Sequence, residues 1–322
     1  MSAIQTATAL QLEALARTID ERPDAAELFY KLAESLWLGG DLVGYARIFR
    51  RAYLLQPKSH LLPEGDSNSF TSEVAAELNA RARALSERGV LFAPVVAALA
   101  LSEARLGRVA AASRLMDFDR FLHCGRVDPP AGMSMASFNQ ALADAIKSDL
   151  QYYEAPTDRA ICRAWRCDNL QNLQDPVVGE FWQTLRAHVA RYIESLPADQ
   201  GHPFLAACPR EFEIGGWAVV SDGSSHHNPH LHPRAWATGV YYVVQPEISR
   251  QSERGWLRIG PPPKLRDAWE RRLIEPVPGS FVLMPGYFWH ETEPMGVDQE
   301  RICIAFEVRS PELALGAGDA DY

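Results

Sequence analysis

The spacing of hydrophobic residues changes from a helical period to strict alternation part-way along the chain. From residue 8 to about 118, apolar positions recur at intervals of three and four, with breaks at Pro23, Gly39, residues 57–63 and Gly107. This spacing predicts an all-helical region. Beyond residue 211, short alternating runs separated by Pro and Gly predict strands instead.

Part of the helical region resembles a tetratricopeptide repeat, residues 24–57. The matching positions are Phe29, Leu32, Ala33 and Leu36, the turn Gly39-Gly40-Asp41, and Phe49, Ala52 and Pro57. Residues 94–118 repeat the pattern loosely, with another helix expected at 75–85. Stacked helices of this kind bind peptides in a groove, cap a catalytic core or form a homodimer surface. The sequence leaves these roles open.

The second half predicts a jelly roll with a buttressing helix. An apolar stripe predicts a helix over residues 176–196. Strands are expected at 212–221, 238–244, 256–259, 280–284 and 301–308. The predicted class is therefore α+β: a helical, tetratricopeptide-like domain at residues 1–118, then a double-stranded β-helix with buttressing helices at residues 119–322.

Charge and composition exclude several kinds of partner. The 322-residue chain has a formal net charge of −9 and a pI near 5.5, so we expect no nucleic-acid partner. Its five cysteines form neither a CxxC pair nor an even set, which favours a reducing compartment. No apolar run reaches the roughly 20 residues that span a bilayer, so we expect a cytoplasmic protein without a membrane partner.

Four of the nine histidines lie between residues 226 and 232. His230 and His232 are two apart, so on an extended strand both imidazoles project from one face and reach one ion together. His290 follows a predicted strand and the turn Pro285-Gly286, where a neighbouring strand brings it alongside. Three histidines then form one open metal site. The alternative is that His230 and His232 are surface loop residues and His290 belongs to an aromatic cluster.

Arg301 begins the last predicted strand, whose two faces differ. Ile302 and the alternate residues after it form the packing face, while Arg301 shares the other face with Cys303 and Ala305. These small side chains leave space in a barrel for a carboxylate that reaches the guanidinium in bidentate fashion.

Six segments, in this order, resemble the 2-oxoglutarate- and iron-dependent oxygenases, specifically a bacterial group that joins tetratricopeptide-like helices to a double-stranded β-helix. They are residues 130–142, the segment GGWAVV around Trp217, and residues 230–244, 255–260, 277–290 and 301–308. The resemblance covers roughly residues 117–310. It implies Fe(II) as cofactor with 2-oxoglutarate and O2 as co-substrates.

The resemblance also implies roles for individual residues. His230 and His290 would be iron ligands, His232 would stand where the family has an aspartate, and Arg301 would hold the distal carboxylate of 2-oxoglutarate. His232 is left open between a direct ligand and a residue one shell out with water completing coordination.

Four further residues are candidates for the co-substrate pocket. Tyr241, Tyr242 and Thr238 are expected to line it. Cys303 stands where many relatives have a serine that hydrogen-bonds the same carboxylate, and a thiol is the weaker donor.

The implied reaction is hydroxylation of a C–H bond with release of succinate and CO2, and desaturation stays open. Aspartyl and asparaginyl β-hydroxylases also join such helices to this barrel, so a peptide or protein side chain is one substrate class and a small molecule the other. The alternatives are a three-histidine zinc or cupin-like enzyme, and a noncatalytic scaffold with an inactive barrel.

Overall fold

The computed structural model describes residues 70–310 apart from positions 88, 90, 149–152, 155–160, 163, 223–224, 263–264 and 266–267, together with isolated positions between 25 and 48. The tetratricopeptide-like repeat predicted at residues 24–57 lies almost wholly outside the described residues and stays a prediction. Within the described residues, no helix is both long and apolar enough to cross a membrane.

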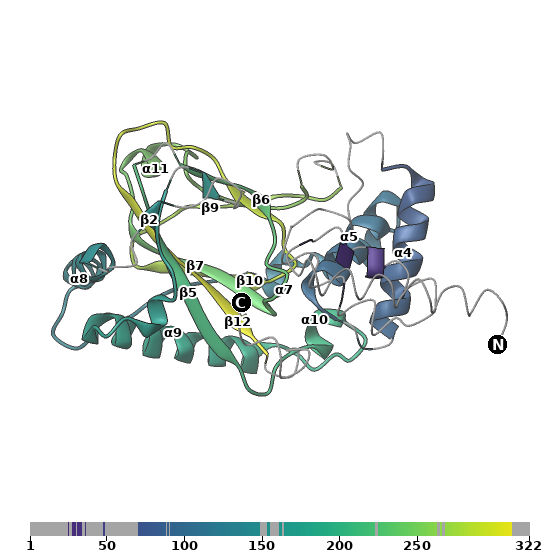
Figure 1. Ribbon diagram of the computed structural model, residues 1–322, viewed down its shortest axis with the longest axis horizontal. Coiled ribbons are helices and arrows are strands. Elements are labelled where there is room, and N and C mark those ends of the chain that lie inside the picture. The colour runs from purple at the N-terminus through teal and green to yellow at the C-terminus, as the bar shows by residue number, and fades with distance from the viewer. Residues whose placement is uncertain are drawn as a thin grey trace.

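From residue 70 onward, four helices precede the first strand (Figure 1). They are α4 (Ser72–Glu87), α5 (Ala93–Arg105), α6 (Val109–Leu115) and α7 (Phe118–Phe121). The predicted break at Gly107 falls between α5 and α6, where this glycine takes a positive φ of 72°. Helix α5 is buried around most of its circumference because it packs against both α4 and α6.

A buried carboxylate fixes α4 against α5. Glu103 is only 1% exposed and accepts a hydrogen bond from Nδ2 of Asn79 at 2.8 Å. The guanidinium groups of Arg83 and Arg108 pair with the same carboxylate. Because an unpaired buried charge is costly, this network requires the two helices to keep their register.

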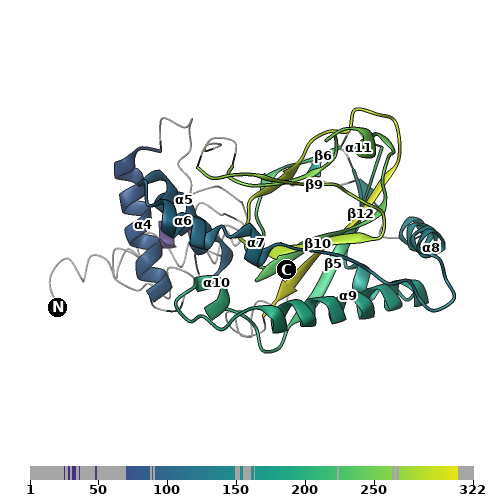
Figure 2. The ribbon, with the colours of Figure 1, turned by 180° about the vertical axis from the view of Figure 1, so that it is seen from behind.

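The remaining chain forms two antiparallel sheets that face each other, as a jelly roll requires (Figures 1 and 2). The seven-stranded sheet has the order β1 (His123–Arg126), β10 (Ser280–Pro285), β7 (Ala237–Val244), β12 (Arg301–Arg309), β5 (Glu213–Ser221), β4 (Trp165–Cys167) and β2 (Tyr153–Glu154). The five-stranded sheet has the order β3 (Ile161–Cys162), β6 (His226–His230), β11 (His290–Thr292), β8 (Leu257–Ile259) and β9 (Arg272–Ile274). All five predicted strands are present.

Strand β12 separates the outside of the barrel from its inside. Ile302, Ile304, Phe306 and Val308 are all 0% exposed and form the outer face, as the alternation predicts. The opposite face carries Arg301, Cys303, Ala305 and Glu307. These residues pair across to Ser221, Val219, Trp217 and Gly215 of β5. Paired residues share a face, so this row points into the barrel.

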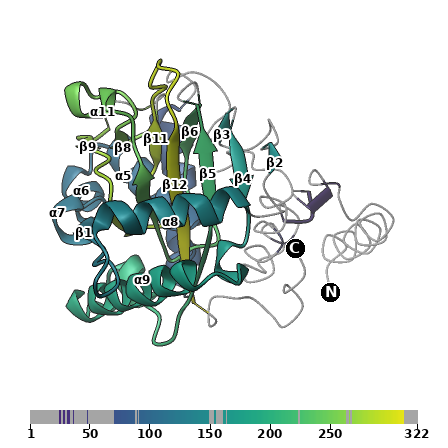
Figure 3. The same cartoon turned by 90° about the vertical axis from the view of Figure 1, so that its left-hand side faces the viewer.

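Two helices cover the outer face of the seven-stranded sheet (Figure 3). Helix α9 (Pro176–Ser195) confirms the predicted buttress, and Asp175 caps it by accepting a hydrogen bond from the backbone N–H of Val177 at 2.8 Å. Helix α8 (Met135–Ser148) lies beside it and packs on β7. Two short helices, α10 (Pro203–Ala206) and α11 (Ile248–Gln251), lie in connections.

One continuous apolar core runs from the helices into the barrel. Leu85 of α4 and Phe281 of β10 belong to the same cluster of buried residues. The hydroxyl of Tyr287 also donates to the backbone carbonyl of Leu115 at 2.5 Å, which ties the barrel to α6. The domain boundary expected at residue 118 stays a prediction.

Candidate metal and co-substrate site

Two segments far apart in the sequence carry the histidine cluster and are fastened to each other. His290 begins β11 and pairs directly with His230, the last residue of β6. The backbone N–H of His232 donates to the carbonyl of Gly286, and Gly286 donates to the carbonyl of Trp236, both at 2.9 Å. A Cβ on Gly286 would lie 2.2 Å from a backbone oxygen, so only glycine permits this close approach.

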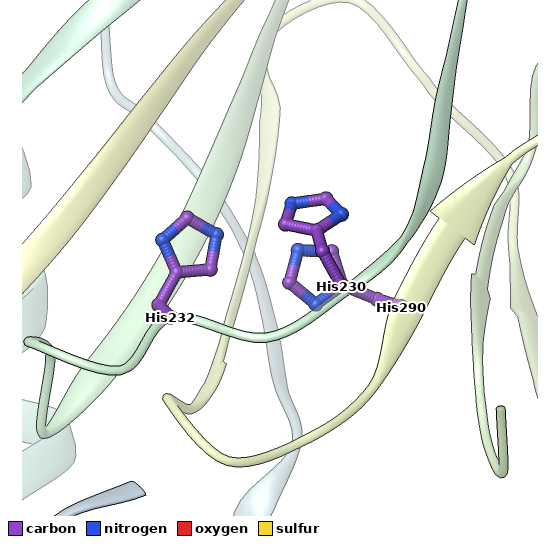
Figure 4. Close-up of side chains that lie close together, drawn as sticks. All are labelled: His230, His232 and His290. Carbon is purple, nitrogen blue, oxygen red and sulfur yellow. The ribbon is translucent and has the colours of Figure 1, made fainter. Parts of the chain in front are cut away.

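The three imidazoles gather in one space (Figure 4). The ring centroids of His230 and His290 are 4.2 Å apart, and those of His232 and His290 are 5.2 Å apart. One ligand atom from each residue lies within 4.8 Å of the other two. Side chains at this separation can hold a single ion between them.

The structure corrects how His232 reaches this cluster. On an extended strand the two imidazoles would project together, but β6 ends at His230 and His232 lies beyond it in a turn. The two rings are tilted by 54° at a centroid separation of 5.3 Å. The convergence therefore comes from the turn held against Gly286.

Each of the three imidazoles has its Nδ1 hydrogen-bonded to an oxygen. His230 pairs with the carbonyl of Asn228 at 2.7 Å and His290 with the carbonyl of Phe288 at 2.9 Å. His232 pairs with the carboxylate of Glu307 at 2.8 Å. An oxygen acceptor places the proton on Nδ1, which leaves Nε2 of every ring as a lone-pair donor. This donor set fits a divalent transition metal.

Burial keeps two of the clustered imidazoles, His230 and His290, neutral. Desolvation, then the charge of His232, lowers the pKa of His230 to about 3. Desolvation, then the charges of His230 and His232, hold the pKa of His290 well below its usual value. Since only a neutral imidazole binds a metal, both rings are in the metal-binding form at neutral pH.

Arg301 points into the same barrel and is 5% exposed. Its Nε donates to the sulfur of Cys303 at 3.3 Å, and Nε2 of Gln245 donates to that sulfur at the same distance. Cys303 pairs across β12 and β7 with Tyr242, so the tyrosine shares this face. We refer to these four neighbouring residues together as the Arg301 pocket: Arg301, Cys303, Tyr242 and Gln245.

The Arg301 pocket contains polar atoms that need a partner. Among the described residues, the hydroxyl of Tyr242 and Oε1 of Gln245 are buried without a hydrogen bond. Burial raises the pKa of Tyr242 far above its usual value, so the hydroxyl keeps its proton and remains a donor. A carboxylate beside the guanidinium would accept from this hydroxyl, so the pocket fits the distal end of 2-oxoglutarate.

The other two pocket candidates lie elsewhere. Tyr241 faces the outside of the barrel, where its hydroxyl donates to Asn139 of α8 at 2.6 Å, which corrects the expectation that it lines the pocket. Alternation along β7 puts neighbouring tyrosines on opposite faces. Thr238 faces inward, but its hydroxyl is bound to the carbonyl of Phe306 at 3.0 Å, and it pairs with Glu307 rather than Cys303.

Glu307 is the site residue that sequence reasoning missed. It lies on the inward face of β12, six residues beyond Arg301, and is 7% exposed. Burial alone would raise its pKa, but the hydrogen bond and charge of His232 and the charge of Arg309 outweigh burial and lower the pKa to about 2. The signal was available, because alternation from Arg301 through Cys303 and Ala305 reaches residue 307.

An aromatic wall completes the space around His232. The indole of Trp217 stacks on the imidazole with centroids 5.9 Å apart and planes 24° apart. The guanidinium of Arg166 lies 4.9 Å from the centroid of Trp217. The stacking on Trp217 and the hydrogen bond to Glu307 together restrain the orientation of the His232 ring.

Residues 215–307 match the family model described as "Putative 2OG-Fe(II) oxygenase". The match supports a 2-oxoglutarate- and Fe(II)-dependent oxygenase. It contains all three clustered histidines, Arg301 and Glu307. Fe(II) and 2-oxoglutarate are accordingly the cofactor and co-substrate of the chain, and its described residues include a histidine triad that could hold a metal ion. No curated protein matches the chain.

Solved structures with a similar arrangement include two prolyl hydroxylases and an epimerase. A Pseudomonas putida prolyl-4-hydroxylase has 17% identity and a TM-score of 0.42, over 63% of this chain and 98% of its own. A Trichoplax adhaerens prolyl hydroxylase, solved with a hypoxia inducible factor peptide, has 13% identity and a TM-score of 0.44, over 65% and 94%. The epimerase SnoN, solved with Fe3+ and alpha ketoglutarate, has 13% identity and a TM-score of 0.44, over 68% and 93%.

Proposed function

We propose that this protein is a dioxygenase that hydroxylates a C–H bond of a peptide or protein side chain or of a small molecule, with release of succinate and CO2. The observation that supports the proposal is that three clustered imidazoles, a buried guanidinium and an unpartnered tyrosine hydroxyl lie inside one barrel. Metal and co-substrate each have their own set of side chains.

The chain's residues divide the work between the two sets. Nε2 of His230, His232 and His290 would hold the iron, and their Nδ1 atoms keep the rings oriented through oxygen acceptors. Arg301 and Tyr242 would hold the distal carboxylate and so fix the direction in which 2-oxoglutarate reaches the metal. Iron held by these side chains would supply the chemistry of oxidative decarboxylation and hydrogen abstraction.

The experiment is anaerobic reconstitution with Fe(II) and 2-oxoglutarate, followed by exposure to O2. We expect the weak visible band of the iron complex with 2-oxoglutarate, and then succinate. His290→Ala should abolish the band because it removes a metal ligand. With Arg301→Ala, the band should appear only at much higher 2-oxoglutarate concentrations. A matched control is Arg186→Ala on α9, whose guanidinium contacts the carbonyl of Phe212 outside the barrel.

Two outcomes would count against the proposal. Succinate that never forms, while Zn(II) supports hydrolysis of a test ester, would favour the zinc enzyme, since three histidines and an open position also describe catalytic zinc. Equal bands in the parent and in both variants would mean that the iron is bound elsewhere.

The helical part supports a further element of this proposal, contact with a peptide or protein substrate, with a homodimer surface as the competing role. It is joined to the barrel beside the turn that carries His232, where Leu91, Phe92 and Val96 lie near Pro233 and Trp236. Photo-crosslinking from position 92 in the full chain would separate the roles: a crosslinked second copy supports the dimer, and capture of an added substrate peptide supports substrate contact.

A further inference from the structure

The histidine cluster has no negative charge of its own. Two histidines and one carboxylate form the common facial triad of non-haem Fe(II) oxygenases, and the carboxylate offsets part of the metal's charge. Here His232 occupies the third position, so three neutral imidazoles would face a divalent cation in a buried space. A buried carboxylate nevertheless lies directly behind one of them: Oε1 of Glu307 is 2.8 Å from Nδ1 of His232.

We propose that Glu307 is a positioning residue that acts through His232 as the carboxylate of this metal site, one side chain removed from the ion. It sets the tautomer of His232 and supplies the negative charge that the three imidazoles lack. The inference rests on the proposed function only for the identity of the metal.

The contacts of His232 show how the tautomer is set. A carboxylate accepts hydrogen bonds only, so Nδ1 of His232 must carry the proton and Nε2 must present its lone pair. The ring also stacks on His290 with planes 5° apart and on Trp217 with planes 24° apart. A ring flip would direct a protonated or carbon edge towards the metal and leave Glu307 unpaired.

The two oxygens of Glu307 have different partners, which fixes the direction of the carboxylate. Oε1 faces His232, whereas Oε2 accepts from Nε and Nη2 of Arg309 at 2.9 and 2.6 Å. The side chain of Arg309 is 51% exposed, so water screens its charge, while the side chain of Glu307 is 9% exposed. The negative charge is therefore felt mainly inside the barrel, towards His232.

A carboxylate in this position strengthens metal binding in two ways. An imidazole that donates to a carboxylate is a more basic ligand, and the pair as a whole carries the charge that a directly bound aspartate would bring. The competing explanation is an ordinary buried ion pair between a protonated His232 and Glu307, which would stabilise the fold without affecting a metal.

Metal affinity, measured without 2-oxoglutarate, separates these explanations. Calorimetric titration of the full chain with Co(II) under anaerobic conditions would compare the parent with Glu307→Gln and Glu307→Ala. We expect the dissociation constant to rise about 10- to 100-fold for Glu307→Ala. The dissociation constant of Glu307→Gln should lie between those of the parent and Glu307→Ala. The amide oxygen of glutamine can still accept a hydrogen bond from Nδ1 of His232, but it carries no charge.

The matched control is Arg309→Gln, which removes the other partner of Glu307 and leaves the contact with His232. It should change Co(II) affinity by about five-fold or less, because half-exposed ion pairs contribute little. The parent and all variants are first compared by circular dichroism and thermal unfolding. Glu307→Gln is nearly isosteric, so it keeps the comparison valid where Glu307→Ala fails to fold.

A double-variant cycle shows whether Glu307 acts through His232. In a His232→Ala background, the additional change Glu307→Gln should leave Co(II) affinity unchanged, because the connecting imidazole is absent. Equal Co(II) affinity in the parent, Glu307→Gln and Glu307→Ala would overturn the inference. The inference would also be overturned if Glu307→Gln lowered Co(II) affinity as much in the His232→Ala background as in the parent.

The outcome is distinguishable from failure of the proposed function. Suppose that Co(II) affinity falls in the order parent, Glu307→Gln, Glu307→Ala, but that the parent never forms succinate. This result would contradict the proposed dioxygenase activity and support the role of Glu307. A parent that forms succinate while all three proteins bind Co(II) equally would contradict only the role of Glu307.

Discussion

The two ends of the barrel interior differ in how completely the chain satisfies its own polar groups. At the metal end, every clustered imidazole has its Nδ1 bound to an oxygen of the protein. In the Arg301 pocket, the hydroxyl of Tyr242 and Oε1 of Gln245 lack partners among the described residues, and Arg301 bonds a weakly accepting sulfur.

This difference indicates how each end meets its ligand. The clustered imidazoles are held in one orientation by these hydrogen bonds, so binding of an ion between them would need little reorganisation. The pocket instead keeps a buried donor, the hydroxyl of Tyr242, whose hydrogen bond is completed only by a ligand, and an unsatisfied buried polar group costs about 1–3 kcal/mol. Substitutions at the two ends should therefore have different signatures in binding and in stability.

The largest expected effect comes from removing a metal ligand. His290→Ala should weaken Co(II) binding by at least about 100-fold, since it removes one of three donor atoms. The matched control is His188→Ala on α9, outside the cluster, which should bind Co(II) like the parent. Loss of metal in both variants would point to a folding defect instead of a ligand.

Arg301→Ala should have the second largest effect and should act on the co-substrate alone. Loss of a buried bidentate partner should raise the dissociation constant of 2-oxoglutarate about 100-fold, as charged hydrogen-bond pairs contribute roughly 2–3 kcal/mol. Co(II) affinity, measured without 2-oxoglutarate, should stay at the parent value. Arg301→Lys is the conservative variant and should recover part of the loss. Weaker Co(II) binding in Arg301→Ala would contradict the separation of the two ends.

Tyr242→Phe should weaken 2-oxoglutarate binding by about ten-fold, because it removes one hydrogen bond to a charged group. Its thermal unfolding without ligand should be unchanged or higher, because the lost hydroxyl is buried and unpartnered. The neighbouring Tyr241→Phe is the matched control with the opposite signature. It breaks a 2.6 Å bond to Asn139 on the outer face, so it should lower the unfolding temperature and leave 2-oxoglutarate binding unchanged.

These contrasts also show what the sequence could and could not predict. Alternation along residues 301–308 predicted which side chains of β12 face inward, because a strand has a fixed period of two. The meeting of His290 with His230 was likewise predicted, since the turn at Pro285-Gly286 returns the chain beside β6. Local spacing could not give the turn that holds His232, which depends on the carbonyl of Gly286 more than fifty residues away.

Deciding which of Tyr241 and Tyr242 faces the barrel interior required the pairing register of β7 with β12 as well as the two-residue period of a strand. Alternation puts the two tyrosines on opposite faces, but it does not say which face is the inner one. Pairing of Tyr242 with Cys303 decides this, and the irregularity between Ile302 and Cys303 shifts the register at that point. Glu307 was missed for another reason: its partner His232 reaches it from outside any strand.

The smallest expected effect, and the only gain, comes from Cys303→Ser in the Arg301 pocket. Its sulfur accepts from both Arg301 and Gln245 at 3.3 Å, and a thiol is a weak acceptor and a weak donor. A hydroxyl would hold both side chains more firmly and donate more strongly to a carboxylate, so 2-oxoglutarate should bind a few-fold more tightly, within the roughly 0.5–1.5 kcal/mol of one neutral hydrogen bond. Co(II) affinity should not change. Cys303→Ala is the control, and it should bind 2-oxoglutarate no better than the parent. If Cys303→Ser weakens 2-oxoglutarate binding as much as Cys303→Ala does, the sulfur only fills space beside Arg301. The carboxylate would then be held by Arg301 and Tyr242 alone.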